Sequence, residues 1–247
     1  MSLEKEKLKF YNHCFLATDG KRAHLRLTGK IMVLTALMEY SDMKWDITAQ
    51  NEYRGACKKA CQEIQASASE RGIPLEFNQC YFQVTLPENS QIDIAKPSTW
   101  GKLLLKGFHC KDFPEMARFY QMHFQCDEVL ILTAFNVKGR SFVSLSSENS
   151  YFKSNVTVIC AGENTHLTST IAHEILHLFG AKDMYYPKEV KAAAEKYLKK
   201  SVMLANMKKL YIDDLTAYLI GWRNTLSDDA FFMLNEIRHI TPQMLHE

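Results

Sequence analysis

The chain has 247 residues, of which 47% are hydrophobic and 23% charged, proportions typical of a globular protein that buries a core. Its 30 Lys and Arg against 28 Asp and Glu leave a net charge of +2, which is too small to attract a polyanion. We therefore expect neither nucleic acid nor a membrane surface as a partner. The sequence does not indicate an oligomeric state.

The N-terminal sequence MSLEKEKLKFYNHC alternates charges and lacks the apolar stretch of a signal peptide. The longest apolar runs, 31–38 and 129–135, are much shorter than the roughly 20 residues that span a bilayer. Seven cysteines, an odd number without framework spacing, indicate reduced thiols. Together these features predict a cytoplasmic protein.

In the first part of the chain, residues 23–42 contain the apolar run IMVLTALM, which predicts a buried strand. Residues 48–71 have a helical pattern that stops at Gly72, a natural C-terminal glycine. Residues 73–86 alternate apolar and polar side chains and predict a second strand, ended by Pro87.

Residues 88–112 form a connection that is long for a loop inside a compact domain. The segment contains Trp100, Phe108 and a Leu103–Leu105 run, too many apolar side chains for a solvated linker. Two hypotheses follow: a lid that restricts access to a substrate cleft, or a strand or short helix packed on the back of the N-terminal lobe.

The second half predicts a helix from Pro114 to about 125, strands at 127–137, 141–146 and 155–160, and a helix through residue 173. Further helices are predicted near 188–200, near 206–222 and in the C-terminal tail. This order predicts an α/β (α+β) fold with a smaller helical C-terminal lobe. We expect one domain, 1–247, with lobes of about 1–180 and 181–247 and a cleft between them.

The predicted helix near 173 carries the motif His173-Glu174-Ile175-Leu176-His177. His173 and His177 lie one helical turn apart, so both imidazoles can reach one ion. Glu174 is offset by one residue and projects beside the ion, where a general base can take a proton from water. A polar group in such an apolar helix is costly unless it binds something.

Gly180 follows the motif and can adopt the left-handed conformation that ends a helix and turns the chain. That turn would let Asp183 reach the same ion as a hard oxygen ligand. Two histidines and one carboxylate leave a fourth position open, which is typical of a catalytic zinc site. We therefore expect one catalytic Zn²⁺. An alternative role for Asp183 is to cap the following segment.

The pattern H-E-x-x-H-x-x-G-x-x-D resembles the metzincin clan of zinc peptidases, in the variant with Asp as third ligand, as in the snapalysins. Ser201-Val202-Met203 resembles the tight turn of that clan that places a methionine beneath the metal. The resemblance implies this role for Met203, and core filling is its alternative role. The resemblance implies a metzincin-like zincin fold: a twisted mixed sheet, an active-site helix and a helical C-terminal lobe. It also implies that the edge segment with Ser141, Phe142 and Val143 binds substrate. The clan's tyrosine two places after the methionine is missing here.

For several other side chains the sequence allows two hypotheses about their role. Tyr185 and Tyr186 flank the site and could donate to an oxyanion or line a pocket wall. Cys110, next to His109, could reach the zinc ion as an internal inhibitory thiolate, or the two residues could be an ordinary part of a loop. Cys57 and Cys61 lie one helical turn apart and are either part of a metal site or two small core residues.

The sequence thus predicts a zinc metalloendopeptidase that acts on a protein or peptide substrate. Two alternatives stay open: a non-catalytic zinc module that recognises a protein partner, and a zinc amidohydrolase acting on a non-peptide amide. Intact Glu174 argues against the first of them, because a structural site has no use for a carboxylate there.

Overall fold

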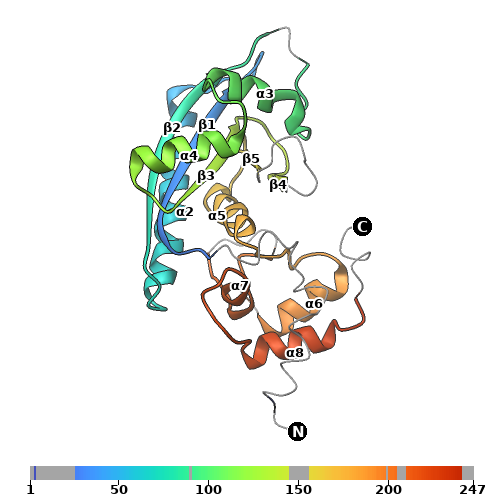
Figure 1. Cartoon of the computed structure of the whole chain (residues 1–247). Coiled ribbons are helices and arrows are strands. Elements are labelled where there is room, and N and C mark those ends of the chain that lie inside the picture. The colour runs from blue at the N-terminus through green and yellow to red at the C-terminus, as the bar shows by residue number, and fades with distance from the viewer. Residues whose placement is uncertain are drawn as a thin grey trace. The chain divides into compact units, whose positions relative to one another are not determined.

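The computed structural model describes Leu3 and residues 26–88, 91–144, 156–198, 200–204 and 210–240. The chain divides into two compact units, Thr28–Leu178 and the combination of Met1–Leu27 with Phe179–Glu247. Figure 1 shows the elements of both units. The cleft predicted between two lobes stays a prediction.

The first unit contains a five-stranded mixed sheet with the order β2-β1-β3-β5-β4. Its strands are β1 (Gly29–Glu39), β2 (Leu75–Thr85), β3 (Glu128–Phe135), β4 (Phe142–Ser144) and β5 (Val156–Cys160). Only β4 runs antiparallel to its neighbour, and it forms one edge of the sheet. β1 is buried along almost its whole length, as its continuous apolar sequence predicts for a central parallel strand.

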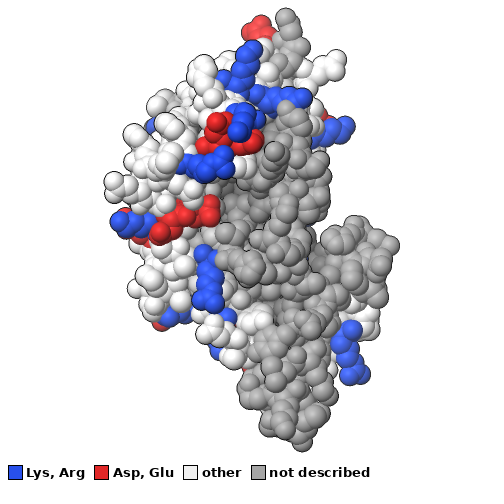
Figure 2. All heavy atoms as spheres, in the orientation of Figure 1, with Lys and Arg blue, Asp and Glu red and all other residues white. Residues whose placement is uncertain are grey.

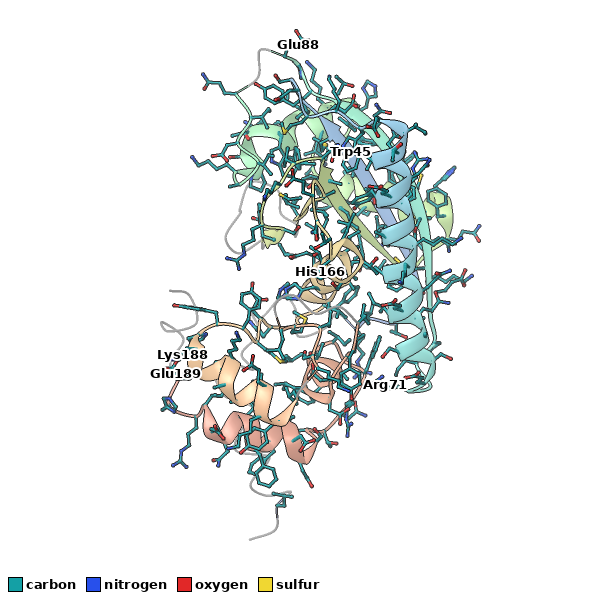
Figure 3. All side chains as sticks on the ribbon, turned by 180° about the vertical axis from the view of Figure 1, so that it is seen from behind. Trp45, Arg71, Glu88, His166, Lys188 and Glu189 are labelled. Carbon is teal, nitrogen blue, oxygen red and sulfur yellow. The ribbon has the colours of Figure 1, made fainter. Side chains whose placement is uncertain are left out.

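One face of the sheet is covered by α2 (Ile47–Ser69) and α5 (Leu167–Leu178), which also pack on each other. Figure 3, seen from behind, shows α2 running from near Trp45 to near Arg71. Asp46 caps its first turn by accepting a hydrogen bond from the N–H of Ala49 (2.7 Å). Gly72, at φ 67°, provides the left-handed residue that ends the helix, as the sequence predicts.

The opposite face is covered by α3 (Pro97–Gly107) and α4 (Phe113–Phe124). Trp100 of α3 is fully buried, and its ring meets that of Phe135 at a centroid distance of 5.7 Å. Burial of one such side chain contributes about 2–3 kcal/mol to folding. The part of 88–112 that spans Pro97–Gly107 is therefore a short helix packed on the sheet, the kind of element that the second hypothesis predicts, while the role of the segment at a substrate cleft stays a prediction.

The second unit contains α6 (Lys188–Tyr197), α7 (Asp214–Leu219) and α8 (Asp228–Glu236). The helix predicted near 206–222 is wrong at its start, because residues 210–213 are not helical and α7 begins only after Asp213, which caps it. Residues 205–209 of that prediction, like 145–146 of the predicted edge strand, lie outside the described residues. Across the described part, the fold is a mixed α/β fold with a five-stranded sheet and seven helices.

None of the described helices has the length and apolar character needed to cross a membrane. On the face shown in Figure 2, acidic side chains of described residues lie directly beside basic ones.

Candidate metal centre

Helix α5 carries the motif residues and begins after a turn that Asn164 organises. The side-chain oxygen of Asn164 accepts the N–H of His166 (2.9 Å), and its amide nitrogen donates to the hydroxyl of Thr170 (3.2 Å). Figure 3 places His166 at the start of this helix. The apolar side chains of α5 are buried against α2, β5 and β4, and they are Ile171, Ala172, Ile175, Leu176 and Leu178. This packing fixes which face of the helix carries the polar motif.

His173 and His177 lie on that face, both half-buried. Their Nε2 atoms are 2.9 Å apart, and the two rings are nearly perpendicular at 88°. Two ligand atoms of a tetrahedral zinc ion, each about 2.0–2.1 Å from it, are about 3.3 Å apart. The spacing of the imidazoles is thus close to that of two ligands on one ion.

Glu174 is the buried acid of the helix, with 5% of its surface exposed. Its charge acts on the thiol of Cys160 at the end of β5: burial, and then the Glu174 carboxylate, raise the pKa of Cys160. The thiol therefore stays protonated at neutral pH. Glu174 is thus a buried carboxylate one residue from His173 in the motif helix.

Asp183 lies in the segment that follows α5. Gly180 has φ 104°, a conformation that glycine adopts without strain, as the sequence predicts for the turn after the motif. The carboxylate of Asp183 accepts a hydrogen bond from the hydroxyl of Tyr185 at 2.8 Å. Ligand atoms of Asp183, His173 and His177 all lie within 4.8 Å of one another, so the three side chains form a group that can hold a metal ion.

Met203 lies in a tight turn closed by a hydrogen bond from the N–H of Leu204 to the carbonyl of Ser201 (3.0 Å). Its side chain is fully buried. The carbonyl of Met203 accepts the N–H of Met184 (2.9 Å), the residue next to Asp183. A backbone hydrogen bond therefore ties this turn to the segment that carries the predicted third ligand.

The turn is held in place by Asp213, a buried residue that was not among the site residues predicted from the sequence. The hydroxyl of Ser201 donates to Asp213 Oδ2 (2.5 Å) and accepts the N–H of Met203 (3.0 Å). Asp213 also accepts from the Thr216 hydroxyl (2.6 Å) and from the N–H groups of Leu215 and Thr216 (both 2.9 Å). The sequence contained one signal for this role: Asp is among the residues preferred at the N-cap of a helix, and Asp213 stands at the start of α7.

The predicted substrate-binding residues lie at the β4 edge of the sheet. Ser141 is buried before the strand, and its hydroxyl accepts the N–H of Cys160 (3.1 Å), which joins β4 to the end of β5. Phe142 and Val143 pair with β5 and are half-buried. Their role towards a substrate stays a prediction.

The hydroxyl of Tyr185 points at Asp183, where its hydrogen bond can orient the carboxylate. Tyr186 is 44% exposed. Cys57 and Cys61 are buried in α2, and among the described residues the only group of three or more metal-ligating side chains is the His173, His177 and Asp183 group.

The donor set is two imidazoles and one carboxylate, and these are donors that a zinc ion accepts. The same donors also suit other divalent metals of the first transition series. Compared with known proteins, the chain matches no family model, and no curated protein is significantly similar to it in sequence.

Proposed function

We propose that this chain is a zinc-dependent metallopeptidase of the metzincin type, in which His173, His177 and Asp183 hold the ion. One observation carries the proposal: these three side chains converge to within 4.8 Å, next to the buried Glu174 on the same helix. A buried glutamate beside such a group has no purpose in a purely structural site. The proposal therefore favours an enzyme over a zinc-containing interaction module.

Zinc bound to this group would polarise the scissile carbonyl and lower the pKa of the attacking water. Glu174 accepts the proton that this water loses as it attacks the carbonyl carbon. It then gives the same proton to the leaving amine when the C–N bond breaks, so it returns to its starting state. The burial of Glu174 keeps bulk water from competing for that proton.

A peptide substrate would bind in extended form along β4, which has a free side in the described sheet because it is the edge strand. An extended peptide adds to such an edge through its backbone hydrogen bonds. The mixed sheet with one antiparallel edge strand and the helix that carries the motif support this arrangement.

The test compares wild type with Glu174→Gln in metal content and in cleavage of a proteome-derived peptide mixture read by mass spectrometry. We expect one zinc per chain in both, and at least a 100-fold loss of cleavage in the variant, since general-base catalysis contributes about 10²–10⁴-fold. Glu70→Gln, on the exposed C-terminus of α2, is the matched control and should cleave as wild type does.

His177→Ala should lose the metal together with activity. A wild-type protein that holds zinc but cleaves no peptide would overturn the peptidase proposal and favour the interaction module. Iron in place of zinc, or hydrolysis limited to small amides, would overturn the assignment of the ion or of the substrate class.

A further inference from the structure

β2 forms the edge of the sheet opposite β4 and offers 11 residues of extended backbone. At the two ends of its pairing with β1, Gly29 N–H donates to the Pro74 carbonyl (2.7 Å) and Leu86 N–H donates to the Glu39 carbonyl (2.8 Å). A residue in a strand points its N–H and C=O to the same side, and successive residues alternate sides. Even-numbered residues of β2 therefore face β1, and odd-numbered residues present their backbone groups at the outer edge.

One of these outward groups is already bound by a side-chain amide. The N–H of Phe77 donates to Oε1 of Gln65 on α2 at 3.4 Å, so the glutamine oxygen takes the place that a peptide carbonyl of a neighbouring strand would take. For the outward N–H groups of Gln79, Tyr81 and Gln83, the described residues provide no acceptor. An unpaired edge of this length is a template for another extended chain.

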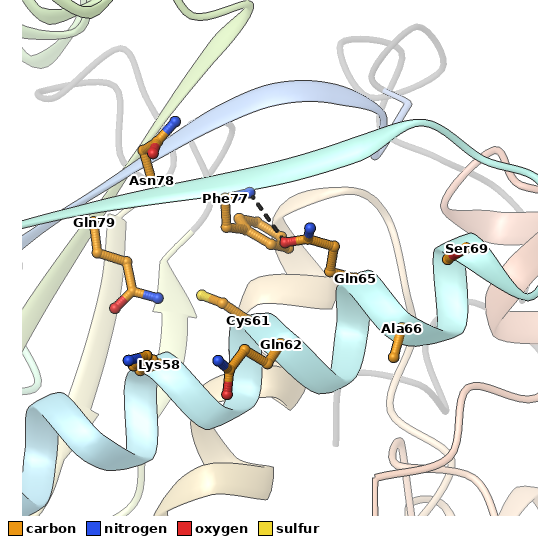
Figure 4. A pocket seen from close by; sticks show the side chains of 9 residues that line it. All are labelled: Lys58, Cys61, Gln62, Gln65, Ala66, Ser69, Phe77, Asn78 and Gln79. Carbon is orange, nitrogen blue, oxygen red and sulfur yellow. Dashed lines mark hydrogen bonds between the residues drawn. The ribbon is translucent and has the colours of Figure 1, made fainter.

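Helix α2 extends beneath this edge and leaves a groove of about 520 Å³ between itself and β2. Figure 4 shows side chains of α2, including Lys58 and Gln62, on one side of the groove and Phe77 and Gln79 of β2 on the other. On the helix side, the rim is a stripe of exposed side chains at helical spacing: Lys58, Gln62, Ala66 and Ser69. From Lys58 to Ser69 the helix rises about 16 Å, the length of about five extended residues.

Amide side chains contribute to the lining of the groove, and one end of it carries the positive charge of Lys58. Gln62, Gln65 and Gln79 line it with amide groups, which can bind a peptide backbone. Lys58 is exposed, and Arg54, one helical turn before it, lies with its guanidinium 5.3 Å from the centre of the Tyr81 ring. No acidic side chain is among the residues that line the groove. A chain with a carboxylate near this end complements these charges.

We propose that the groove between α2 and β2 binds an extended segment of another protein, which adds a strand to β2 and places an acidic side chain beside Lys58. Backbone hydrogen bonds to the odd-numbered residues of β2 supply the affinity, and the cations at one end supply the preference for acidic sequences. The proposal is independent of the metal site and of the peptidase function, because it shares no residue with either.

The test is titration of the ¹⁵N-labelled full chain with an acetylated peptide amide of alternating Thr and Val that carries Asp at each end. Saturable shifts of the amide signals of Gln79, Tyr81 and Gln83 are expected. The same peptide with Lys at each end should bind about tenfold more weakly, because a like charge replaces an opposite one. A version in which Pro replaces each Val should give no saturable shifts, because it cannot complete the ladder.

Lys58→Glu should weaken binding of the acidic peptide about tenfold. Its matched control is Lys59→Glu, an adjacent exposed residue that pairs with Glu63 outside the groove and should leave the affinity unchanged. Ala66→Arg should fill the groove and abolish binding without unfolding the helix, since Ala66 is exposed.

Equal losses for Lys58→Glu and Lys59→Glu, shifts centred on β4, or no saturable shift with the acidic peptide would each overturn the proposal. A concentration-dependent dimer in sedimentation equilibrium that Ala66→Arg abolishes would also overturn it, because a second copy of the chain would then occupy the groove.

Discussion

The helix that carries His173 and His177 and the segment that carries Asp183 position their side chains in different ways. In α5 the helical repeat and the burial of its apolar face are sufficient to bring two imidazoles to 2.9 Å. Asp183 belongs to a segment without regular structure, and a chain of side-chain and backbone hydrogen bonds from Asp213 holds the neighbouring turn. Regular structure positions groups that are close in sequence, whereas an irregular segment depends on a remote residue.

The chain of hydrogen bonds runs from Asp213 to Ser201, from Ser201 to Met203, and from Met203 to Met184, which is next to Asp183. All of these residues belong to the unit that contains Phe179–Glu247. We therefore expect changes at Asp213 to affect Asp183, the proposed third ligand, while the paired histidines of α5 stay in place.

The largest effect is expected for Asp213→Ala. The substitution leaves two hydroxyls and two backbone N–H groups without their charged acceptor, and loss of such a buried network costs more than the roughly 1 kcal/mol of an average point substitution. We expect a loss of about 3 kcal/mol in the free energy of unfolding, measured by urea denaturation of the metal-free protein. Zinc affinity, measured by competition with a chromophoric chelator, should fall about tenfold at a temperature where the variant is folded.

Ser201→Ala removes one link of the same chain and should give a smaller loss of stability, about 1 kcal/mol, with a similar loss of zinc affinity. If Asp213→Ala unfolds the protein, Ser201→Ala still tests the comparison. Unchanged zinc affinity in a folded Ser201→Ala variant would show that the turn does not position Asp183.

This difference also explains what the sequence could and could not predict. α2, the second strand and the motif helix follow from periodicity and from the local glycine Gly72, so they were predicted within a few residues. The first strand was predicted over 23–42 and is shorter, Gly29–Glu39, because only its continuous apolar run is buried in the sheet. The grouping of His173 and His177 follows from helical spacing alone. These features depend on interactions between residues that are near in the sequence.

The start of α7 and the role of Asp213 could not be predicted in this way. The sequence predicted a helix near 206–222, but Asp213 uses its side chain to cap Leu215 and Thr216 and to hold Ser201, 12 residues earlier. The packing of α3 in the core also depends on the sheet it meets, so the sequence left two hypotheses for 88–112. A contact between distant residues has no periodic signature.

A smaller effect is expected for Gly180→Ala. At φ 104° an alanine is strained, and its Cβ would lie 3.3 Å from the carbonyl oxygen of Leu219. We expect a loss of about 1–2 kcal/mol in the free energy of unfolding and weaker zinc binding, because the segment to Asp183 must shift.

The matched control is Gly55→Ala in α2, where an added Cβ meets no atom within 4 Å. Alanine is the better helix former there, so this variant should gain about 0.5–1 kcal/mol. Both values come from urea denaturation. If the two substitutions had effects of the same sign, the left-handed turn would not be what requires glycine at position 180.

The smallest effect is expected for Tyr185→Phe. The phenol donates to one carboxylate oxygen of Asp183 at 2.8 Å, and a hydrogen bond of this kind orients a ligand towards its ion. Its loss should weaken zinc binding about tenfold, which is at the low end of the effect of such supporting groups. Because phenylalanine keeps the packing of the ring, the free energy of unfolding of the metal-free variant should stay within about 0.5 kcal/mol of the wild-type value. Tyr186→Phe is the control, because its hydroxyl belongs to a side chain that is 44% exposed and lies next in sequence. Chelator competition measures both variants, and equal zinc affinities in the two would mean that packing of the segment alone orients Asp183.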